Sequence, residues 1–211
     1  MSARPWVLAS RNAGKLRELR PLFADAGIAV IDLREAGVLE SREEDALECF
    51  ETFEENALAK ARWFAERVHG LPVVADDSGL VVRALGGAPG VRSKRWSGRV
   101  DLSGAALDAA NNALLVERLR GVKDRRATFV CAAAWRDGDR ELVARGEVPG
   151  TIVLEDEARG AHGFGYDPLF RADELGMTLA EATVAEKQAV SHRGRAFTEL
   201  LLRLSQLTGP S

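Results

Sequence analysis

The sequence is poor in cysteine and carries no large excess of either charge. Only Cys49 and Cys131 occur among 211 residues, which disfavours a disulfide-stabilised secreted domain and suits a reducing cytoplasm. The 29 basic and 32 acidic side chains give a net charge of −3. Because no basic excess is available to neutralise the phosphates of a nucleic acid, we expect no nucleic-acid partner.

Long apolar runs are also missing. No segment approaches the ~20 apolar residues that a membrane-spanning helix needs, so no membrane partner is expected. Residues 1–6 lack the apolar stretch of a signal peptide. No Cys/His spacing resembles a zinc site, and no serine lies in the Gly-x-Ser-x-Gly frame of a nucleophile elbow. A cytoplasmic globular protein is the expectation that remains.

Hydrophobic periodicity predicts strands that alternate with helices. The predicted strands are 6–9, 28–31, 73–75, 80–82, 127–135, 141–148 and 150–154, and the predicted helices are 16–26, 53–69, 105–119 and 197–207. Asp137-Gly138 between two strands indicates a hairpin. No linker separates two autonomous cores, so we expect residues 1–211 to form a single α/β domain with a mixed sheet and one or two lobes.

Two adjacent carboxylates follow an apolar strand and form the most informative segment. The run Val73 to Ala75 predicts a buried strand, which we expect to end at Asp76 and Asp77 before Gly79. Buried carboxylates are costly unless a cation compensates their charge, and a divalent metal often does so. Ligands also bind at the carboxyl ends of strands in α/β sheets. Taken alone, however, the pair is explained more simply as the start of a turn.

Two segments carry residue types suited to phosphate. Residues 10–15 precede a predicted helix, where backbone amides and Lys15 suit an anion. A solvated turn explains this segment equally well. Lys60 lies beside the apolar stripe of the 53–69 helix, with Glu48 upstream in reach of the strand end at Asp77. A lysine in such a position usually extends its stem over apolar surface, which is the simpler explanation of Lys60 alone.

Two further segments suit a base or an anion. Residues 163–168 combine glycines, which let the backbone approach a ligand, with aromatic surfaces for stacking. Residues 185–194 bring Lys187, His192 and Arg193 within seven residues. The alternative explanation of residues 163–168 is a tight turn with core aromatics. The alternative for Lys187, His192 and Arg193 is a structural or surface role.

Taken in order, these segments resemble one enzyme family, the inosine/xanthosine triphosphate pyrophosphatases. The resemblance rests on Ser-Arg-Asn-Ala-Gly-Lys at 10–15, Glu-Asn-Ala-Leu-Ala-Lys-Ala at 55–61, Ala-Asp-Asp-Ser-Gly-Leu at 75–80, Ala-Leu-Gly-Gly-Ala-Pro-Gly-Val at 84–91, Gly-Phe-Gly-Tyr-Asp-Pro-Leu-Phe at 163–170 and Glu-Lys-Gln-Ala-Val-Ser-His-Arg-Gly at 186–194. It implies an elongated mixed sheet flanked by helices, with two lobes and the active site in the cleft between them, and a homodimer. It also implies Mg²⁺-dependent cleavage of dITP, ITP or XTP to the monophosphate and pyrophosphate, which cleanses the nucleotide pool.

The resemblance implies a role for individual residues. Asp77 would be a metal ligand and the proton acceptor for the attacking water, and Glu48 would be the second metal ligand, with Asp76 as the alternative. The family usually has Thr-Gly where this chain has Cys49-Phe50. The substrate would be bound by Ser10, Arg11, Asn12, Ala13, Gly14, Lys15, Lys60, Ser78, Phe164, Gly165, Tyr166, Asp167, Lys187, His192 and Arg193.

The chemistry of the substrate agrees with these assignments. A tetra-anionic triphosphate needs several cations, which lysines and Arg193 would supply. Hypoxanthine presents an acceptor at O6 and a donor at N1–H, whereas adenine reverses both, so a site paired with the first pattern rejects the second. Asp167 would accept from N1–H and Arg193 would donate to O6.

Two other functions compete with this interpretation. A Maf-like pyrophosphatase with another base preference would carry a Ser-Pro-Arg-Arg run after its first strand, whereas this chain has Asn-Ala-Gly-Lys at 12–15. A nucleotide-binding module without catalysis would not need the acidic pair Asp76 and Asp77 together with Lys15 and Lys60. A screen of pyrophosphate release over several nucleotides separates these possibilities.

Overall fold

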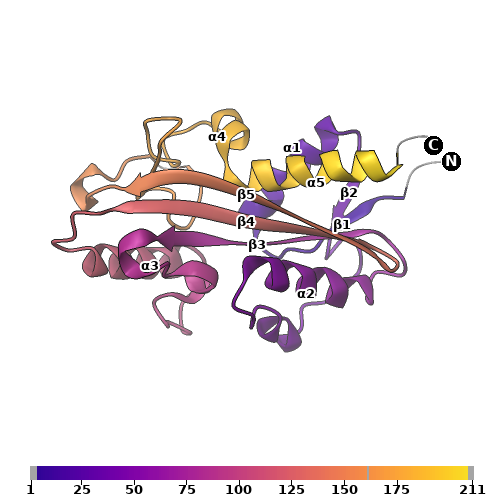
Figure 1. Ribbon diagram of the computed structural model, residues 1–211. Coiled ribbons are helices and arrows are strands. Elements are labelled where there is room, and N and C mark those ends of the chain that lie inside the picture. Colours follow the sequence, from indigo (N-terminus) through magenta and orange to yellow (C-terminus); the bar gives the residue numbers. More distant parts are fainter. Residues whose placement is uncertain (1–3, 161, 209–211) are drawn as a thin grey trace. The chain divides into compact units, whose positions relative to one another are not determined.

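The computed structural model describes residues 4–160 and 162–208 (Figure 1). Residues 1–3, part of the segment predicted to lack a signal peptide, lie outside this range. The helices are α1 (Ala13–Asp25), α2 (Phe53–Ala65), α3 (Gly104–Arg118), α4 (Val184–Val190) and α5 (His192–Thr208), and the strands are β1 (Trp6–Leu8), β2 (Val30–Asp32), β3 (Val73–Val82), β4 (Arg126–Asp137), β5 (Arg140–Ile152) and β6 (Phe170–Ala172). Within the described ranges, no helix has the length and apolar character required to cross a bilayer.

The strands form one six-stranded mixed sheet in the order β2-β1-β3-β4-β5-β6. β1 pairs in parallel with β2 and with β3, with Leu8 opposite Asp32 on one side and Val74 on the other. β5 and β6 pair antiparallel. The prediction of an α/β fold with a mixed sheet flanked by helices is therefore confirmed.

Two strands are longer than the sequence pattern predicts. We expected a strand to end at Asp76 and Asp77, but β3 continues through both to Val82. The strand need not end, because successive side chains point to opposite faces and each carboxylate finds its own cations. β5 likewise runs unbroken through Pro149 to Ile152 where we expected two strands. The short strand β6 and the helix α4 were not predicted.

Several helix boundaries also differ from prediction. α1 begins at Ala13 rather than at 16, because the side chain of Asn12 caps it by accepting from the amides of Gly14 and Lys15. α2 begins at Phe53, as predicted, with the side chain of Thr52 accepting from the amide of Glu55, but it ends at Ala65 rather than near 69. α5 begins at His192, five residues before its apolar stripe.

The chain divides into two compact units that share the long strands. The first unit holds residues 1–77, 131–146 and 193–211, and the second holds residues 78–130 and 147–192. The expectation of a single bilobed domain remains a prediction. In the first unit, α1 and α5 cover one face of the sheet and α2 covers the other (Figure 1). Its core packs α1 and α5 on the strands through Leu8, Leu19, Leu22, Phe23, Val74, Cys131, Ala133, Phe197 and Leu200.

The second unit has its own apolar core. Leu115 and Leu119 at the end of α3 pack against strand residues, and the segment around β6 adds Tyr166, Leu169, Phe170 and Leu179. Phe129 of β4 lies with its ring centroid 4.5 Å from that of Phe170. This core holds the 163–168 loop close to α3, because Tyr166 is itself a member of it.

A substitution at Phe23 tests the description of the core of the first unit. The Phe23 side chain is fully buried and meets the ring of Phe197 edge to face, with centroids 5.6 Å apart. We expect Phe23→Ala to lower the free energy of unfolding by about 3–5 kcal/mol, measured by urea denaturation. Leu202→Ala, at a position that is 54% exposed, should change it by less than about 0.5 kcal/mol. Equal losses in the two variants would contradict this description of the core.

Candidate active site

Asp76 lies at the centre of a buried charge cluster in the first unit. Its Oδ2 atom is 2.8 Å from Lys15 Nζ of α1 and 3.3 Å from Arg193 Nε of α5. The thiol of Cys131 contacts the same oxygen at 3.8 Å. Arg193 also donates to the carboxylate of Glu18 on α1. Asp76 is thus compensated by cations from the two helices on one face of the sheet.

Asp77 points to the other face, where α2 lies. Asn56 donates from Nδ2 to Asp77 Oδ2 at 3.0 Å, and Lys60 Nζ lies 3.4 Å from Asp77 Oδ1. The same Nζ is 2.7 Å from Glu48 Oε1. Lys60 therefore draws together two carboxylates that come from a strand and from the loop before α2.

Asn56 also holds the loop that carries Glu48. Its Oδ1 accepts from the amide of Phe50 at 2.9 Å, and its Nδ2 donates to the Phe50 carbonyl at 3.3 Å. Asn56 is completely buried. This one amide therefore links the Glu48-Cys49-Phe50 segment to Asp77, and the loop has a defined path without the glycine found in the resembling family.

The two neighbouring aspartates differ in their electrostatics. Burial by itself would raise the pKa of Asp76, but the charges of Lys15 and Arg193 outweigh it and hold that pKa well below its ordinary value. Burial raises the pKa of Asp77, with Lys60 opposing the shift and Glu48 adding to it. Asp76 is thus a stable anion, whereas Asp77 binds a proton more readily than an ordinary aspartate.

The carboxylates around Lys60 fit a magnesium ion. Glu48 and Asp77 already converge on one cation, the ammonium of Lys60. Within residues 4–160 and 162–208, no group of three or more Asp, Glu, His or Cys side chains is placed to hold a metal. Mg²⁺ typically binds one or two carboxylates and takes its other ligands from water and substrate phosphates. Two carboxylates therefore suffice for a magnesium ion that binds together with a phosphate chain.

The 10–15 segment is built as a capped helix start. Asn12 Oδ1 accepts from the amides of Gly14 and Lys15 at 2.8 and 3.1 Å, and Ser10 Oγ accepts from the amide of Asn12. The guanidinium of Arg11 binds the carboxylate of Glu44. Ala13 is the first residue of α1. Of this predicted phosphate loop, Lys15 is the residue that the fold brings to the aspartates.

A second group of predicted residues gathers in the second unit. Lys187 of α4 lies with Nζ 2.6 Å from Asp167 Oδ2, which also accepts from the amide of Phe164 at 2.8 Å. The same Nζ is 5.1 Å from the ring centroid of Phe164. A side chain at Gly163 would collide with Asp167, because its Cβ would lie 2.1 Å from Oδ2. The glycine therefore permits the close turn that brings these groups together.

Backbone and ring contacts fix the rest of this loop. Gly165 donates its amide to Asp108 and accepts at its carbonyl from Asn112, both on α3. Tyr166 donates its hydroxyl to the Ser93 carbonyl at 2.8 Å. His192 stacks on Phe129, with ring centroids 4.7 Å apart. Ser78 lies in β3 beside Asp77, half-buried.

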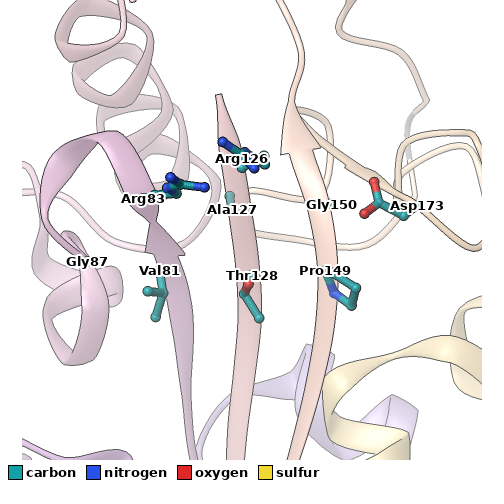
Figure 2. Close-up of a pocket in the computed structure, with 9 residues that line it drawn as sticks. All are labelled: Val81, Arg83, Gly87, Arg126, Ala127, Thr128, Pro149, Gly150 and Asp173. Carbon is teal, nitrogen blue, oxygen red and sulfur yellow. The ribbon is translucent and has the colours of Figure 1, made fainter. Parts of the chain in front are cut away.

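The second unit also has a cavity of about 500 Å³ on its sheet (Figure 2). Figure 2 shows Arg83, Arg126 and Asp173 among the residues that line it, with Val81 and Thr128 on the strands below the two arginines in this view. The two arginines are engaged by Asp124, at 3.4 and 2.9 Å. None of its lining residues was predicted to act on substrate, so the cavity is not the candidate active site.

Comparisons with known proteins identify the family. The Ham1 family model matches residues 6–202. The chain belongs to the Ham1 family.

Relatives of similar length agree. The dITP/XTP pyrophosphatase of Burkholderia pseudomallei is 52% identical over 204 residues, which are 95% of this chain and 93% of the relative. That of Frankia alni is also 52% identical, over 95% and 97% of the two chains. A solved Ham1 protein from Coxiella burnetii is 38% identical, with a TM-score of 0.80 over 97% of this chain and 100% of the other. The predicted family is confirmed, and with it the prediction that the Ham1 chain is an enzyme of the hydrolase class.

Sequence reasoning missed several residues of the candidate site. Asn56 belongs to the motif at 55–61 but was not assigned to the site; its place one turn before Lys60 was the signal that could have found it. Glu18 lies three residues after Lys15 on α1 and was missed, although the same helical spacing applies. Cys131 and Asp108 carried no sequence signal, because only the fold brings them to their partners.

The two aspartates of the candidate site should differ in their effect on stability. Asp76→Asn would leave Lys15 and Arg193 without their shared anion, and we expect a loss of about 3–5 kcal/mol in the free energy of unfolding. Burial disfavours the charge of Asp77, so Asp77→Asn should cost no more than about 1 kcal/mol. Chemical denaturation at pH 7 measures both. A larger loss for Asp77→Asn would refute this assignment.

Proposed function

We propose that this Ham1 protein hydrolyses deaminated purine nucleoside triphosphates, dITP, ITP and XTP, to the monophosphate and pyrophosphate with Mg²⁺. The observation that carries the proposal is the convergence of Glu48 and Asp77 on Lys60, beside the Lys15–Asp76 pair. The pyrophosphatase names of the relatives support the same activity. Family membership is also the support for a homodimer and for action in the cytoplasm, where nucleotide pools are used.

The charges of the cluster explain why a divalent cation would be required. Three cationic side chains, Lys15, Lys60 and Arg193, face four carboxylates in the contacts of this cluster. The triphosphate would add about four negative charges. Repulsion between these anions would oppose binding unless a cation lay between them. Glu48 and Asp77 would hold Mg²⁺, which when bound would offset phosphate charge and lower the pKa of the attacking water.

Each residue of the first unit then has a defined task. Asp77 would accept a proton from the attacking water as the oxygen bonds to phosphorus and the bond between the α- and β-phosphates breaks. Its place in the carboxylate pair, with Oδ1 3.4 Å from Lys60 Nζ, supports this role. Lys60 would exchange part of its contact with Glu48 for a phosphate oxygen. Lys15 would do the same from its position at Asp76.

The base would be read by residues of the second unit. Asp167 would accept from N1–H of hypoxanthine or xanthine, and Phe164 would offer a stacking surface. The sequence suggested Arg193 as the donor to O6, but Arg193 binds Asp76 and Glu18. Lys187, 2.6 Å from Asp167, places a donor next to that acceptor and is the better-supported partner for O6. Adenine would meet a donor and an acceptor in the wrong order.

The reaction products test the proposal directly. With Mg²⁺, ITP, dITP or XTP should yield the monophosphate and pyrophosphate, and ATP, whose base reverses the donor and the acceptor, should react far more slowly. Chromatography of the nucleotide products and a pyrophosphate assay measure this. Release of orthophosphate with IDP as the product would contradict the assigned bond. A preference for pyrimidine nucleotides would instead favour a Maf-like activity, and binding without turnover would favour a module that does not catalyse.

The carboxylate pair can be tested separately from the fold. Asp77→Asn removes the proton acceptor and a metal ligand but retains the shape, so we expect kcat for ITP to fall by roughly 10²-fold or more. Glu48→Gln should raise the Mg²⁺ concentration needed for half-maximal rate. If Glu48→Gln left the Mg²⁺ titration unchanged, the second ligand would be another acid, with Asp76 the next candidate.

A further inference from the structure

Two side chains of α3 hold both sides of a single glycine. Asp108 Oδ2 accepts from the amide of Gly165 at 2.8 Å, and Asn112 Nδ2 donates to the Gly165 carbonyl at 3.0 Å. The two residues are four apart on one helix and therefore lie on the same face. The amide belongs to the peptide that follows Phe164, and the carbonyl belongs to the peptide that precedes Tyr166. The helix thus sets the orientation of both peptide planes.

Gly165 has no side chain whose packing could fix its backbone conformation. Its φ of +63° lies in the left-handed region, which residues other than glycine rarely adopt. A Cβ added there would meet no atom within 4 Å. Since glycine is also the most flexible residue in the unfolded or loosened chain, the orientation of this peptide depends on the hydrogen bonds that α3 makes to it.

The residues on either side of Gly165 carry the groups of the proposed base site. Phe164 precedes it, and Asp167 follows two residues later with its carboxylate bound to the Phe164 amide and to Lys187. A rotation of the Gly165 peptides would therefore move the Phe164 ring relative to the Asp167–Lys187 pair. Base recognition needs these groups fixed, because a hydrogen-bond pattern discriminates only when its donors and acceptors are held in position.

We propose that Asp108 and Asn112 are positioning residues for base discrimination, which act by fixing the Gly165 peptides. The inference rests on the proposed function, in which the 163–167 loop reads the base. Neither side chain needs to touch the substrate. Their contribution should therefore appear in the preference for inosine over adenosine nucleotides, and much less in the chemistry at the phosphates.

The neighbouring residue Asn111 provides a matched control. It makes the same kinds of bond from the same helix to another segment, accepting from the Ser97 amide at 2.8 Å and donating to the Lys94 carbonyl at 3.1 Å. It is buried, and it makes neither of the bonds to Gly165. Asn111→Ala therefore removes a comparable clamp, and any loss of stability that goes with it, without loosening the Gly165 peptides.

The chemistry of each position predicts a graded series of variants. Asp108→Ala removes a charged acceptor, whereas Asp108→Asn retains an amide oxygen that accepts from Gly165. Asn112→Asp places a carboxylate oxygen against the Gly165 carbonyl, where two acceptors repel. Asn112→Ala removes one hydrogen bond together with Oδ1, a buried atom for which no hydrogen-bond partner exists in the described part of the chain. It should therefore cost little stability and remain folded.

The experiment compares kcat and KM for ITP and ATP in these variants, together with calorimetric Kd values for IMP and AMP. For Asp108→Ala and Asn112→Asp we expect the ITP/ATP ratio of kcat/KM to fall about tenfold or more, mainly through a higher KM for ITP. Asn112→Ala should show a smaller fall in the same direction. Asp108→Asn should restore most of the preference, and Asn111→Ala should keep the wild-type ratio even if its melting temperature falls.

The outcomes separate this inference from the proposed function. If the wild-type protein released no pyrophosphate from ITP, the proposed function would fail, while the IMP/AMP ratio of Kd would still report on the Gly165 clamp. If folded Asp108→Ala and Asn112→Ala kept the wild-type preference in both measurements, the inference would be overturned. The inference would also be overturned if the Asp108 and Asn112 variants lost kcat/KM equally for ITP and ATP and Asn111→Ala lost as much. Asp108 and Asn112 would then have only a structural role.

Discussion

The placement of two adjacent aspartates on opposite faces of β3 is the constraint on which the first unit depends. An extended strand sends Asp76 and Asp77 in opposite directions, so no single cation can serve both at short range. Asp76 is met by α1 and α5 through Lys15 and Arg193, and Asp77 is met by α2 through Lys60 and Asn56. Three helices are thus tied electrostatically to one strand, and the same ties bring the proposed catalytic groups together.

The two faces of β3 differ in the electrostatic environment of their aspartate. On the α1 and α5 face the charges are nearly balanced at Asp76, which makes its carboxylate a fixed part of the structure with a lowered pKa. On the α2 face, burial disfavours the charge of Asp77 and raises its pKa. The residue proposed to act in chemistry is therefore the one whose charge burial disfavours, and its neighbour is the one whose charge is compensated. Asp76 and Asp77 are identical in type, and they differ in their proposed roles because their surroundings differ.

Much of this could be predicted from the sequence, because the relevant patterns are local. The apolar run before Asp76 and the apolar stripe of the 53–69 helix predicted the elements that carry the site. The strand end at Asp77 was predicted wrongly, since a run of polar residues signals a turn only if their charges lack partners. Those partners lie outside the strand, in Lys15 and Arg193 for Asp76 and in Lys60 for Asp77. Cys131 depends on tertiary contacts of the same kind, which no spacing records, whereas the spacing of Asn56, one turn before Lys60, was a usable signal.

In the second unit, the arrangement of the proposed base site depends on the backbone geometry of the 163–167 loop rather than on a dense cluster of charges. Gly163 allows Asp167 to approach the backbone, and Gly165 adopts a conformation that α3 must stabilise from outside. The sequence indicated that both glycines let the backbone approach a ligand, but conformational freedom alone does not fix the orientation of a loop. Recognition of a base requires the opposite property. The side chains that remove this freedom, Asp108 and Asn112, lie more than fifty residues earlier on a helix whose own pattern indicates only a surface and a core face. Selectivity in this fold would therefore be supported by residues that are distant in the chain from those that contact the substrate.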